Sequence, residues 1–285
     1  MANGLPYNFG GLSVENSSYG NSNIVILPVP FDKTSSWIKG SDKGPRAIIN
    51  ASRNMELYDI ETASEVYREG IHTAKAITAG NARALSDKVR KKVRGLLADK
   101  KFVVVMGGEH SVSLGTIQAH AEAFKNISIL HLDAHSDMRG SYEGDKYSHA
   151  CIMARAKEVT RNIVSVGIRS SDSSELKNIN KRNTFYASDI RKSKDWIKKV
   201  VKRLSGSVYI SIDLDVFDPS IMPSTGTPEP GGLGWYEVLD LMESVMRNKK
   251  VAGFDVVELC PIKNNPAPDF LAAKLIYKLL SLKFA

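Results

Sequence analysis

The 285-residue sequence predicts an α/β protein of three layers, α/β/α, in which helices cover both faces of a mainly parallel central sheet. Short runs rich in β-branched residues alternate with longer segments of helical periodicity along the whole chain. Several of these runs, such as FVVVM at 102–106, are apolar throughout, which is typical of strands covered on both faces. Because the alternation is unbroken, we expect a single domain spanning 1–285.

The expected elements follow one another in order. Strands are predicted at 23–29, 102–106, 127–133, 163–168, 184–187, 207–215 and 251–259. Helices are predicted between them, at about 82–98, 111–125, 149–159, 193–204, 234–248 and 267–282. Residues 1–22 are rich in Gly, Asn and Ser and are predicted to form an arm or a segment that lies on the surface.

Composition excludes several classes of protein. The chain is 42% hydrophobic and 25% charged, and it has no apolar run of the roughly 20 residues that cross a bilayer. The N-terminus lacks the pattern of a signal peptide, and two cysteines are too few for a disulfide framework, so we expect a cytoplasmic protein. The net charge of +8 comes from Lys and Arg spread along helical segments, which indicates solvated helix faces and no nucleic-acid partner.

Polar residues cluster where the predicted strands end. In LHLDAHSDMRG (130–140), Asp133, His135 and Asp137 occupy every second position, and alternate side chains of a strand share one face. Asp213 and Asp215 end another strand in the same way, and His110 follows a third. Because the carboxyl ends of parallel strands form one edge of the sheet, we expect these side chains to converge.

Four converging aspartates require cations to neutralise them, and two divalent ions carry the matching charge. Carboxylate and imidazole ligands without cysteine favour Mn²⁺ over structural Zn²⁺. Six protein ligands for two ions leave coordination positions open for water. Taken alone, either the motif at 133–137 or the pair Asp213 and Asp215 could be a turn cap with a surface ion pair. Their coincidence at one sheet edge favours a metal site.

The remaining histidines and the cysteines have plainer interpretations. His72 and His120 are expected in helices or loops without a role. His131 is expected to be a packed residue that hydrogen-bonds beneath the ligands. Cys151 and Cys260 are interpreted as small buried packing residues.

These segments resemble the signatures of a known family, the ureohydrolases, which include arginase and agmatinase. The resemblance is carried by GGEHS (107–111), DAHSD (133–137) and SIDLDVFDPSIMPSTGTPEPGG (211–232). Weaker similarity lies in PFDKTSSWIKGSDKGPRAII (30–49), KYSHA (146–150) and DVVELCP (255–261). The chain departs from the family pattern at Pro28, at Ser224 and in SSWI (35–38), none of which is a ligand position.

The resemblance implies a single ureohydrolase domain with the arginase/deacetylase-like fold, and a binuclear Mn²⁺ enzyme that releases urea from a small guanidino substrate. It implies that Asp133 and Asp213 bridge the two ions. The other ligands are then His110 and Asp137 at one ion and His135 and Asp215 at the other. The family also implies a homo-oligomer, either a trimer or a hexamer.

The catalytic residues are expected to be Asp137, His149 and Glu258. Two metal ions that share a water lower its pKa, and Asp137 beside it can accept the proton. His149 resembles the histidine that exchanges protons with solvent, and Glu258 resembles the glutamate that pairs with the guanidinium. Gly107 and Gly108 are expected to let the chain turn sharply, and the run from Pro223 to Gly232 to form a stiff loop over the entrance.

Substrate preference depends on the loop after the DAHSD motif. Arginases carry an Asn where this chain has Arg139, and the segment that follows supplies Glu143 and Asp145 for a distal cation. Agmatine, cleaved to putrescine and urea, is therefore expected, with aminopropylagmatine, arginine or another guanidino acid as alternatives. Two other classes remain open: a metal-dependent deacetylase with one Zn²⁺, and a non-catalytic metal-stabilised scaffold.

Overall fold

The computed structural model describes residues 4–285, and its core is one eight-stranded sheet in the order β2-β1-β3-β8-β7-β4-β5-β6. Every neighbouring pair of strands is parallel. The strands are β1 (Ile24–Val29), β2 (Ile71–Thr73), β3 (Phe102–Gly107), β4 (Ser128–Leu132), β5 (Ile163–Ile168), β6 (Thr184–Tyr186), β7 (Ser207–Asp213) and β8 (Lys250–Val257).

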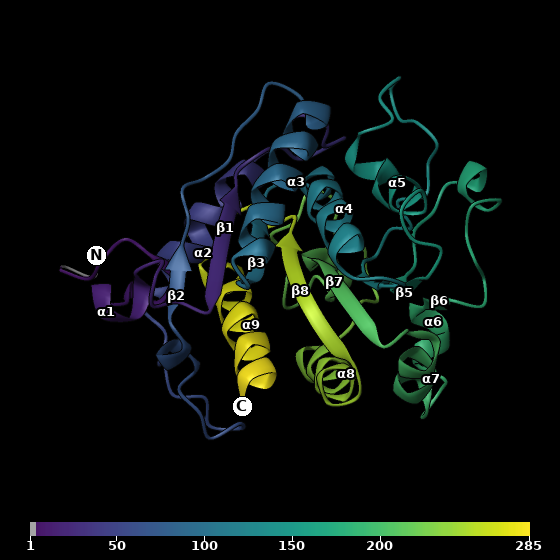
Figure 1. Cartoon of the computed structure of the whole chain (residues 1–285). Coiled ribbons are helices and arrows are strands. Elements are labelled where there is room, and N and C mark those ends of the chain that lie inside the picture. The colour runs from purple at the N-terminus through teal and green to yellow at the C-terminus, as the bar shows by residue number, and fades with distance from the viewer. Residues whose placement is uncertain (1–3) are drawn as a thin grey trace.

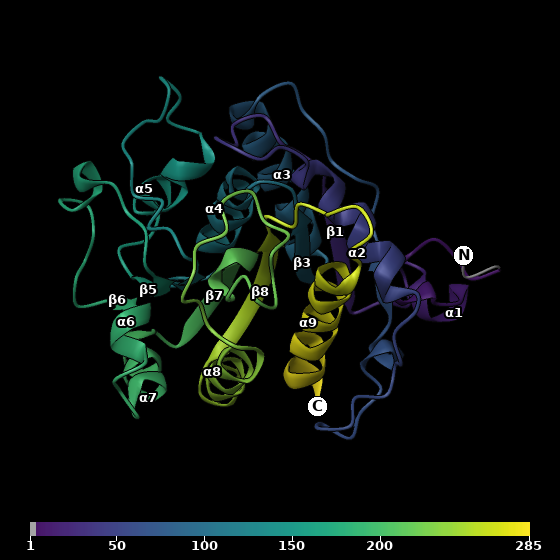
Figure 2. The ribbon, with the colours of Figure 1, turned by 180° about the vertical axis from the view of Figure 1, so that it is seen from behind.

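Helices pack on both faces of this sheet, which gives the predicted three layers (Figure 1). One face is covered by α3 (Ala82–Ala98), α4 (Ser113–Ala123) and α5 (Ile152–Ala156). The other face is covered by α2 (Gly44–Ser52), α9 (Ala267–Phe284), α8 (Trp235–Asn248) and α7 (Trp196–Arg203), as the view from behind shows (Figure 2). Two further short helices are α1 (Val14–Ser17) and α6 (Ala187–Ile190).

Burial on both faces explains the apolar strands. Every residue of β1, β4 and β5 is buried, and the hydrophobic core divides into clusters on the two sides of the sheet. The α/β fold class is therefore confirmed, and each strand predicted from the sequence is present. The strand β2 and the helix α2 were missed, because a three-residue strand and a helix that begins with Gly-Pro carry little periodic signal.

The N-terminal segment lies against the edge of the sheet. Phe9 and Leu12 are buried, and the backbone N–H of Phe9 donates to the Thr73 hydroxyl of β2 at 2.9 Å. The segment 4–22 therefore covers the edge strand β2, and residues 1–3 of the predicted arm lie outside the described residues.

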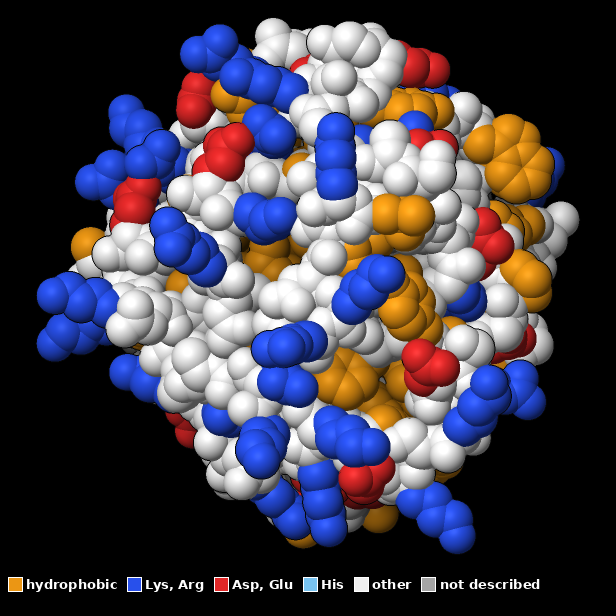
Figure 3. Space-filling view, turned by 90° about the vertical axis from the view of Figure 1, so that its right-hand side faces the viewer, with side chains coloured by type: hydrophobic (Ala, Val, Ile, Leu, Met, Phe, Trp, Pro, Cys, Tyr) orange, Lys and Arg blue, Asp and Glu red, His pale blue; other side chains and the backbone are white. Residues whose placement is uncertain are grey.

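The face over β6, α6 and α7 shows how the positive charge is distributed (Figure 3). Lys and Arg side chains are scattered across it, with acidic and apolar side chains between them. Lys198, Lys199 and Lys202 are on α7, and Lys199 pairs with Asp195 at 2.8 Å. Among the described helices, none is both long and apolar enough to span a membrane.

Candidate active site

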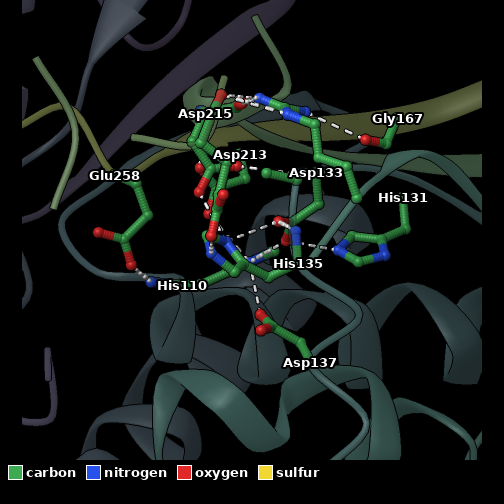
Figure 4. A network of polar contacts seen from close by, with 12 residues as sticks. His110, His131, Asp133, His135, Asp137, Gly167, Asp213, Asp215 and Glu258 are labelled. Carbon is green, nitrogen blue, oxygen red and sulfur yellow. Dashed lines mark hydrogen bonds and ion pairs between the residues drawn. The ribbon is translucent and has the colours of Figure 1, made fainter. Parts of the chain in front are cut away.

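The predicted residues come together at the carboxyl ends of the four central strands (Figure 4). His110 follows β3, Asp133 follows β4, Asp213 ends β7 and Glu258 follows β8. The three strands that carry the predicted ligands are not all adjacent, because β8 lies between β3 and β7. A cavity of about 290 Å³ opens above these strand ends, and every candidate residue except the fully buried Asp133 lines it.

His110 is the centre of the first group of potential ligands. Its Nδ1 lies 3.1 Å from Asp133 Oδ2, 3.0 Å from Asp137 Oδ2 and 3.4 Å from Asp213 Oδ2, yet it has no hydrogen-bond partner among the described residues. Ligand atoms about 2.1 Å from one ion and at right angles to each other lie about 3 Å apart. The spacing of these atoms therefore fits a shared divalent cation.

His135 forms the second group. Its Nδ1 lies 2.8 Å from Asp215 Oδ2 and 3.5 Å from Asp133 Oδ1, so Asp133 belongs to both groups. Asp213 is placed less clearly, since its Oδ1 accepts the backbone N–H of Asp215 at 2.9 Å and only its Oδ2 faces His110. Two groups that share Asp133 could hold two metal ions, whereas the bridging role of Asp213 stays a prediction.

A buried chain of hydrogen bonds fixes the orientation of the His110 ring. The Ser211 hydroxyl donates to Asp255 Oδ1 at 2.8 Å and therefore accepts from His110 Nε2–H at 3.0 Å. The Tyr209 hydroxyl donates to Asp255 Oδ2 at 2.6 Å. Because Nε2 donates to Ser211, Nδ1 is the ring nitrogen that faces the carboxylates and is available to a metal ion. The sequence did not indicate a role for Ser211, Asp255 or Tyr209, although Ser211 and Asp255 each begin a quoted motif.

His131 is packed and hydrogen-bonds to Asp133, as predicted, and its ring lies in the same cluster as His110, Asp133 and Asp137. Its Nε2 is 2.7 Å from Asp133 Oδ2, and its Nδ1 is 3.2 Å from the Ser165 hydroxyl. Both ring nitrogens are thus engaged, and the ring holds Asp133 in place.

The protonation of these groups reflects the crowding of negative charge. Burial, together with the Asp215 and Asp133 carboxylates, raises the pKa of Asp213 well above its usual value. Burial opposes protonation of His135, but Asp215 and Asp133 outweigh it and raise the pKa of His135 to about 12. The pKa of His110 is likewise raised, against its burial, by the carboxylates around it. The site therefore attracts positive charge, and a divalent cation would take the place of these protons.

Two of the candidate catalytic residues have a strained backbone. Asp137 has φ 52° and Glu258 has φ 66°, a left-handed conformation that costs a non-glycine residue about 1–2 kcal/mol. The strand β4 ends at Leu132, so Asp137 reaches the site through this turn and not through the alternation of a strand. The predicted convergence is confirmed, but its expected cause was wrong for Asp137.

Glu258 faces the metal-ligand groups from β8. Its Oε1 accepts the backbone N–H of His110 at 2.6 Å, and its own N–H donates to Gly108 O at 2.8 Å. Burial and the nearby Glu109 raise the pKa of Glu258 well above its usual value. A cationic ligand in the cavity would stabilise the carboxylate form.

The glycines before His110 serve close packing. Neither has a positive φ, but a Cβ on Gly108 would lie 2.0 Å from Phe31 O, and one on Gly107 would lie 2.4 Å from a Val112 methyl group. The expected sharp turn is therefore the wrong reason for these glycines.

His149 lies on the cavity wall, at the start of a short 3-10 helix (His149–Cys151). Its ring meets the Tyr142 ring edge-on at 5.8 Å, and its Nδ1 lies 3.2 Å from the Ser148 hydroxyl. Cys151, two residues on, is buried and free, as is Cys260.

The outer part of the cavity differs from the prediction. Arg139 and Tyr142 line it, but the cavity is not lined by Glu143 or Asp145. Asp145 instead accepts the backbone N–H of Tyr147 at 2.8 Å. Other lining residues come from Ser35–Ile38, from Ser170–Asp172 with Glu175, and from Gly226–Thr227. Of these, the sequence predicted only the last, in the run from Pro223 to Gly232, to lie over the entrance.

The loop from Asp218 to Gly232 reaches the cavity through Gly226 and Thr227. Asp218 closes its two ends, since its carboxylate accepts N–H groups from Ser220, Gly231 and Gly232. The Ser220 hydroxyl, together with these N–H groups, lowers the pKa of Asp218 to about 2. The sequence indicated this loop by its Pro and Gly content.

Comparisons with known proteins agree with this geometry. The model of the Arginase family matches residues 22–281. The chain is 38% identical to an N(1)-aminopropylagmatine ureohydrolase of Thermus thermophilus over 94% of this chain and 93% of that protein. It is 32% identical to an agmatinase of Pyrococcus horikoshii over 92% of each chain.

A solved structure, the agmatine ureohydrolase of Thermoplasma volcanium, has the same fold. It superposes with a TM-score of 0.88 at 32% identity, over 98% of this chain and 94% of that one. The family model covers nearly the whole chain, including both groups of potential metal ligands. This chain therefore belongs to the arginase family.

Proposed function

We propose that the protein is a binuclear metal-dependent ureohydrolase that cleaves the guanidino group of an agmatine-type amine into urea and the free amine. Agmatine, giving putrescine, is the first candidate substrate. The observation that carries the proposal is the pairing of two ligand groups, joined by Asp133, with the carboxylate of Glu258 across one cavity.

The proposed ligands are His110, Asp133 and Asp137, with Asp213, at one ion, and His135, Asp133 and Asp215, with Asp213, at the other. Oxygen and imidazole donors without cysteine favour Mn²⁺. Two divalent ions would supply an acidified water and polarise the site.

The protein side chains supply binding and proton transfer. Glu258 can accept hydrogen bonds from the substrate guanidinium and hold its carbon over the ligand groups. A water that attacks this carbon loses a proton, and Asp137, which lies 3.0 Å from His110 Nδ1 and lines the cavity, can accept it. The departing amine must gain a proton before the C–N bond breaks, and His149 on the cavity wall can exchange that proton with solvent.

The outer cavity supports a substrate with a distal cation. Its wall carries the carboxylates of Asp172 and Glu175 and the guanidinium of Arg139. Glu175 is buried and accepts the backbone N–H groups of Met138 and Asp172, so Asp172 is the carboxylate open to a cation. Arg139 is held 3.7 Å from Asp172 and stacks 4.9 Å from the Tyr142 ring. Trp37, 69% exposed, adds an aromatic surface at which an ammonium group can bind.

A second candidate substrate is N(1)-aminopropylagmatine. Relatives of that name and agmatinases both match about nine-tenths of the chain. The exposed Trp37 at the cavity mouth favours a longer cationic substrate, since agmatine is the shorter of the two.

The test is a panel of agmatine, aminopropylagmatine, arginine and guanidinobutyrate, assayed for urea with the Mn²⁺-loaded protein. We expect one of the two amines to exceed arginine by at least tenfold in kcat/KM, because a missing or repelled charge partner costs about 2–5 kcal/mol. Equal rates with arginine would refute this substrate class. Activity confined to an acetylated amine would point to the deacetylase alternative.

We also propose that the enzyme works in the cytoplasm as a homo-oligomer, either a trimer or a hexamer. Two free buried cysteines are compatible with a reducing compartment. Sedimentation of the purified protein would test the oligomeric state.

A further inference from the structure

Glu109 is a fully buried carboxylate that neighbours the candidate ligand His110 but faces away from the ligand groups. Its oxygens accept hydrogen bonds from the backbone N–H groups of Lys33, Thr34 and Ser35, at 2.7, 2.6 and 3.0 Å, and from the hydroxyls of Thr34 and Ser111, both at 2.6 Å. A buried carboxylate is tolerated only when such donors replace its water. Glu109 therefore fixes the loop that follows β1.

This loop forms one wall of the cavity. Its residues Ser35–Ile38 line the space above the ligand groups. It can approach the GGEHS segment because Gly108 has no side chain, and the Glu109 N–H donates to Phe31 O at 2.8 Å. The same five-residue segment thus presents His110 to one side and anchors the cavity wall on the other.

Thr34 connects this anchor to His149. Its hydroxyl donates to Glu109 Oε1 at 2.6 Å, and its oxygen accepts the backbone N–H of His149 at 3.0 Å. The same oxygen lies 3.4 Å from His149 Nδ1. His149 is only half-buried, and the Tyr142 ring lies on another side of its imidazole. One hydroxyl thus joins a fixed carboxylate to the residue proposed to carry protons.

We propose that Thr34, held by Glu109, is a positioning residue that sets the place and orientation of His149 for proton transfer. This inference rests on the proposed function. It assigns a role to Glu109 and Thr34, neither of which belongs to the metal-ligand groups. Thr34 acts through His149 and has no contact with the reacting atoms.

The test is a double-mutant cycle between Thr34→Val and His149→Ala, read as urea release by the Mn²⁺-loaded protein. Valine has the shape of threonine but neither accepts from His149 nor donates to Glu109, and it keeps the backbone bond to Glu109. We expect Thr34→Val to lower kcat about 10-fold to 100-fold, within the range that acid–base catalysis contributes, with KM changed less than about threefold. In the His149→Ala background, Thr34→Val should cost less than about a further twofold.

Two controls separate positioning from general support of the loop. Thr34→Ser keeps the hydroxyl and should restore most of kcat. Ser111→Ala removes the other hydroxyl that donates to Glu109 Oε1 and has no contact with His149. It should lower kcat less than Thr34→Val does, and by the same factor whether or not His149 is present.

The inference fails if Thr34→Val lowers kcat by the same factor in the wild type and in the His149→Ala variant. It also fails if Ser111→Ala lowers kcat as much as Thr34→Val does and likewise loses its effect when His149 is replaced. It also fails if Thr34→Val leaves kcat unchanged. The wild-type protein separates these outcomes from failure of the proposed function, since a loaded wild type that releases no urea would refute the function itself. Bound Mn²⁺, counted in each variant, should stay at the wild-type value.

Discussion

The effect on stability of replacing Asp213 by asparagine should have opposite signs in the metal-free and the metal-loaded protein. In the metal-free protein, Asp213 is a buried carboxylate whose pKa is raised by burial and by Asp215 and Asp133. Asparagine keeps the shape, and its Oδ1 can still accept the Asp215 N–H that lies 2.9 Å away. The substitution removes the free-energy cost of keeping this carboxyl protonated and loses little else, so the metal-free variant should be more stable than the wild type.

The structure limits the size of this gain. A carboxyl group whose pKa in the unfolded chain is about 3.9 can destabilise the folded state by at most about 5 kcal/mol at pH 7.5, when it must stay protonated. We expect a gain of about 1–3 kcal/mol, because the new amide must be accommodated beside His110 Nδ1 at 3.4 Å. That gain corresponds to a rise in Tm of roughly 2–12 °C.

In the metal-loaded protein, the wild type should instead be more stable than the variant. At a free Mn²⁺ concentration 100 times the Kd, each site stabilises the wild type by about 2.7 kcal/mol, so two sites should raise Tm by roughly 10–20 °C. If Asp213 is a ligand of both ions, its replacement should remove at least two-thirds of this stabilisation, about 3.6 kcal/mol, which exceeds the gain in the metal-free protein. The loaded variant should then be less stable than the loaded wild type.

Thermal unfolding of chelator-treated protein, with and without Mn²⁺, measures both effects. Asp87→Asn, the same chemical change at an exposed position of α3, is the matched control and should alter neither Tm nor the Mn²⁺-induced rise. A variant that is less stable without metal and keeps the full Mn²⁺-induced rise would refute the assignment of Asp213.

Three further predictions follow from the same site. His149→Ala should keep its Mn²⁺ and lose about 100-fold in kcat, with partial rescue by imidazole, whereas loss of Mn²⁺ would make His149 a ligand instead. Glu258→Gln should keep its Mn²⁺ and lower kcat/KM for the preferred amine about 30-fold or more, and an unchanged kcat/KM would exclude Glu258 from guanidinium binding. Metal-free protein should lose stability as pH rises from 6.5 to 8.5. The raised pKa of His135, about 12, gives stability that is complete below the unfolded value near 6.5 and is lost progressively as pH rises from there toward 12. The raised pKa of Asp213 acts in the same direction, because the carboxyl of the unfolded chain is charged at these pH values. Calorimetry of chelated protein at several pH values measures this loss, and a Tm that rises over this range would contradict the pKa shifts.

The sequence predicted the ligand groups because they depend on short-range patterns. Asp133, His135 and Asp137 fall within five residues, and the position of each group just past an apolar run indicated one edge of a parallel sheet. The layers followed from the same alternation of strands and helices. These features are encoded locally and do not require knowledge of which strands are neighbours.

Features that depend on contacts between distant segments were not predictable in this way. Nothing local places β8 between β3 and β7, so the contact of Glu258 with the backbone of His110 was not predicted. The link from Glu109 to His149 joins three segments, and its residues have no periodic pattern. Glu143 and Asp145 were assigned to the cavity by closeness in sequence, but the turn that carries them directs the chain elsewhere.

The most direct test of the central claim is the identity of the products formed from agmatine and from aminopropylagmatine by the Mn²⁺-loaded protein. Hydrolysis at the guanidino carbon with departure of the alkylamine gives urea and the corresponding amine in a one-to-one ratio, and mass spectrometry of the reaction mixture measures both. We predict this ratio for at least one of the two substrates, and no turnover after chelation of the metal. Release of ammonia with a ureido product, or no urea from either substrate, would contradict the assignment of the site as a ureohydrolase centre.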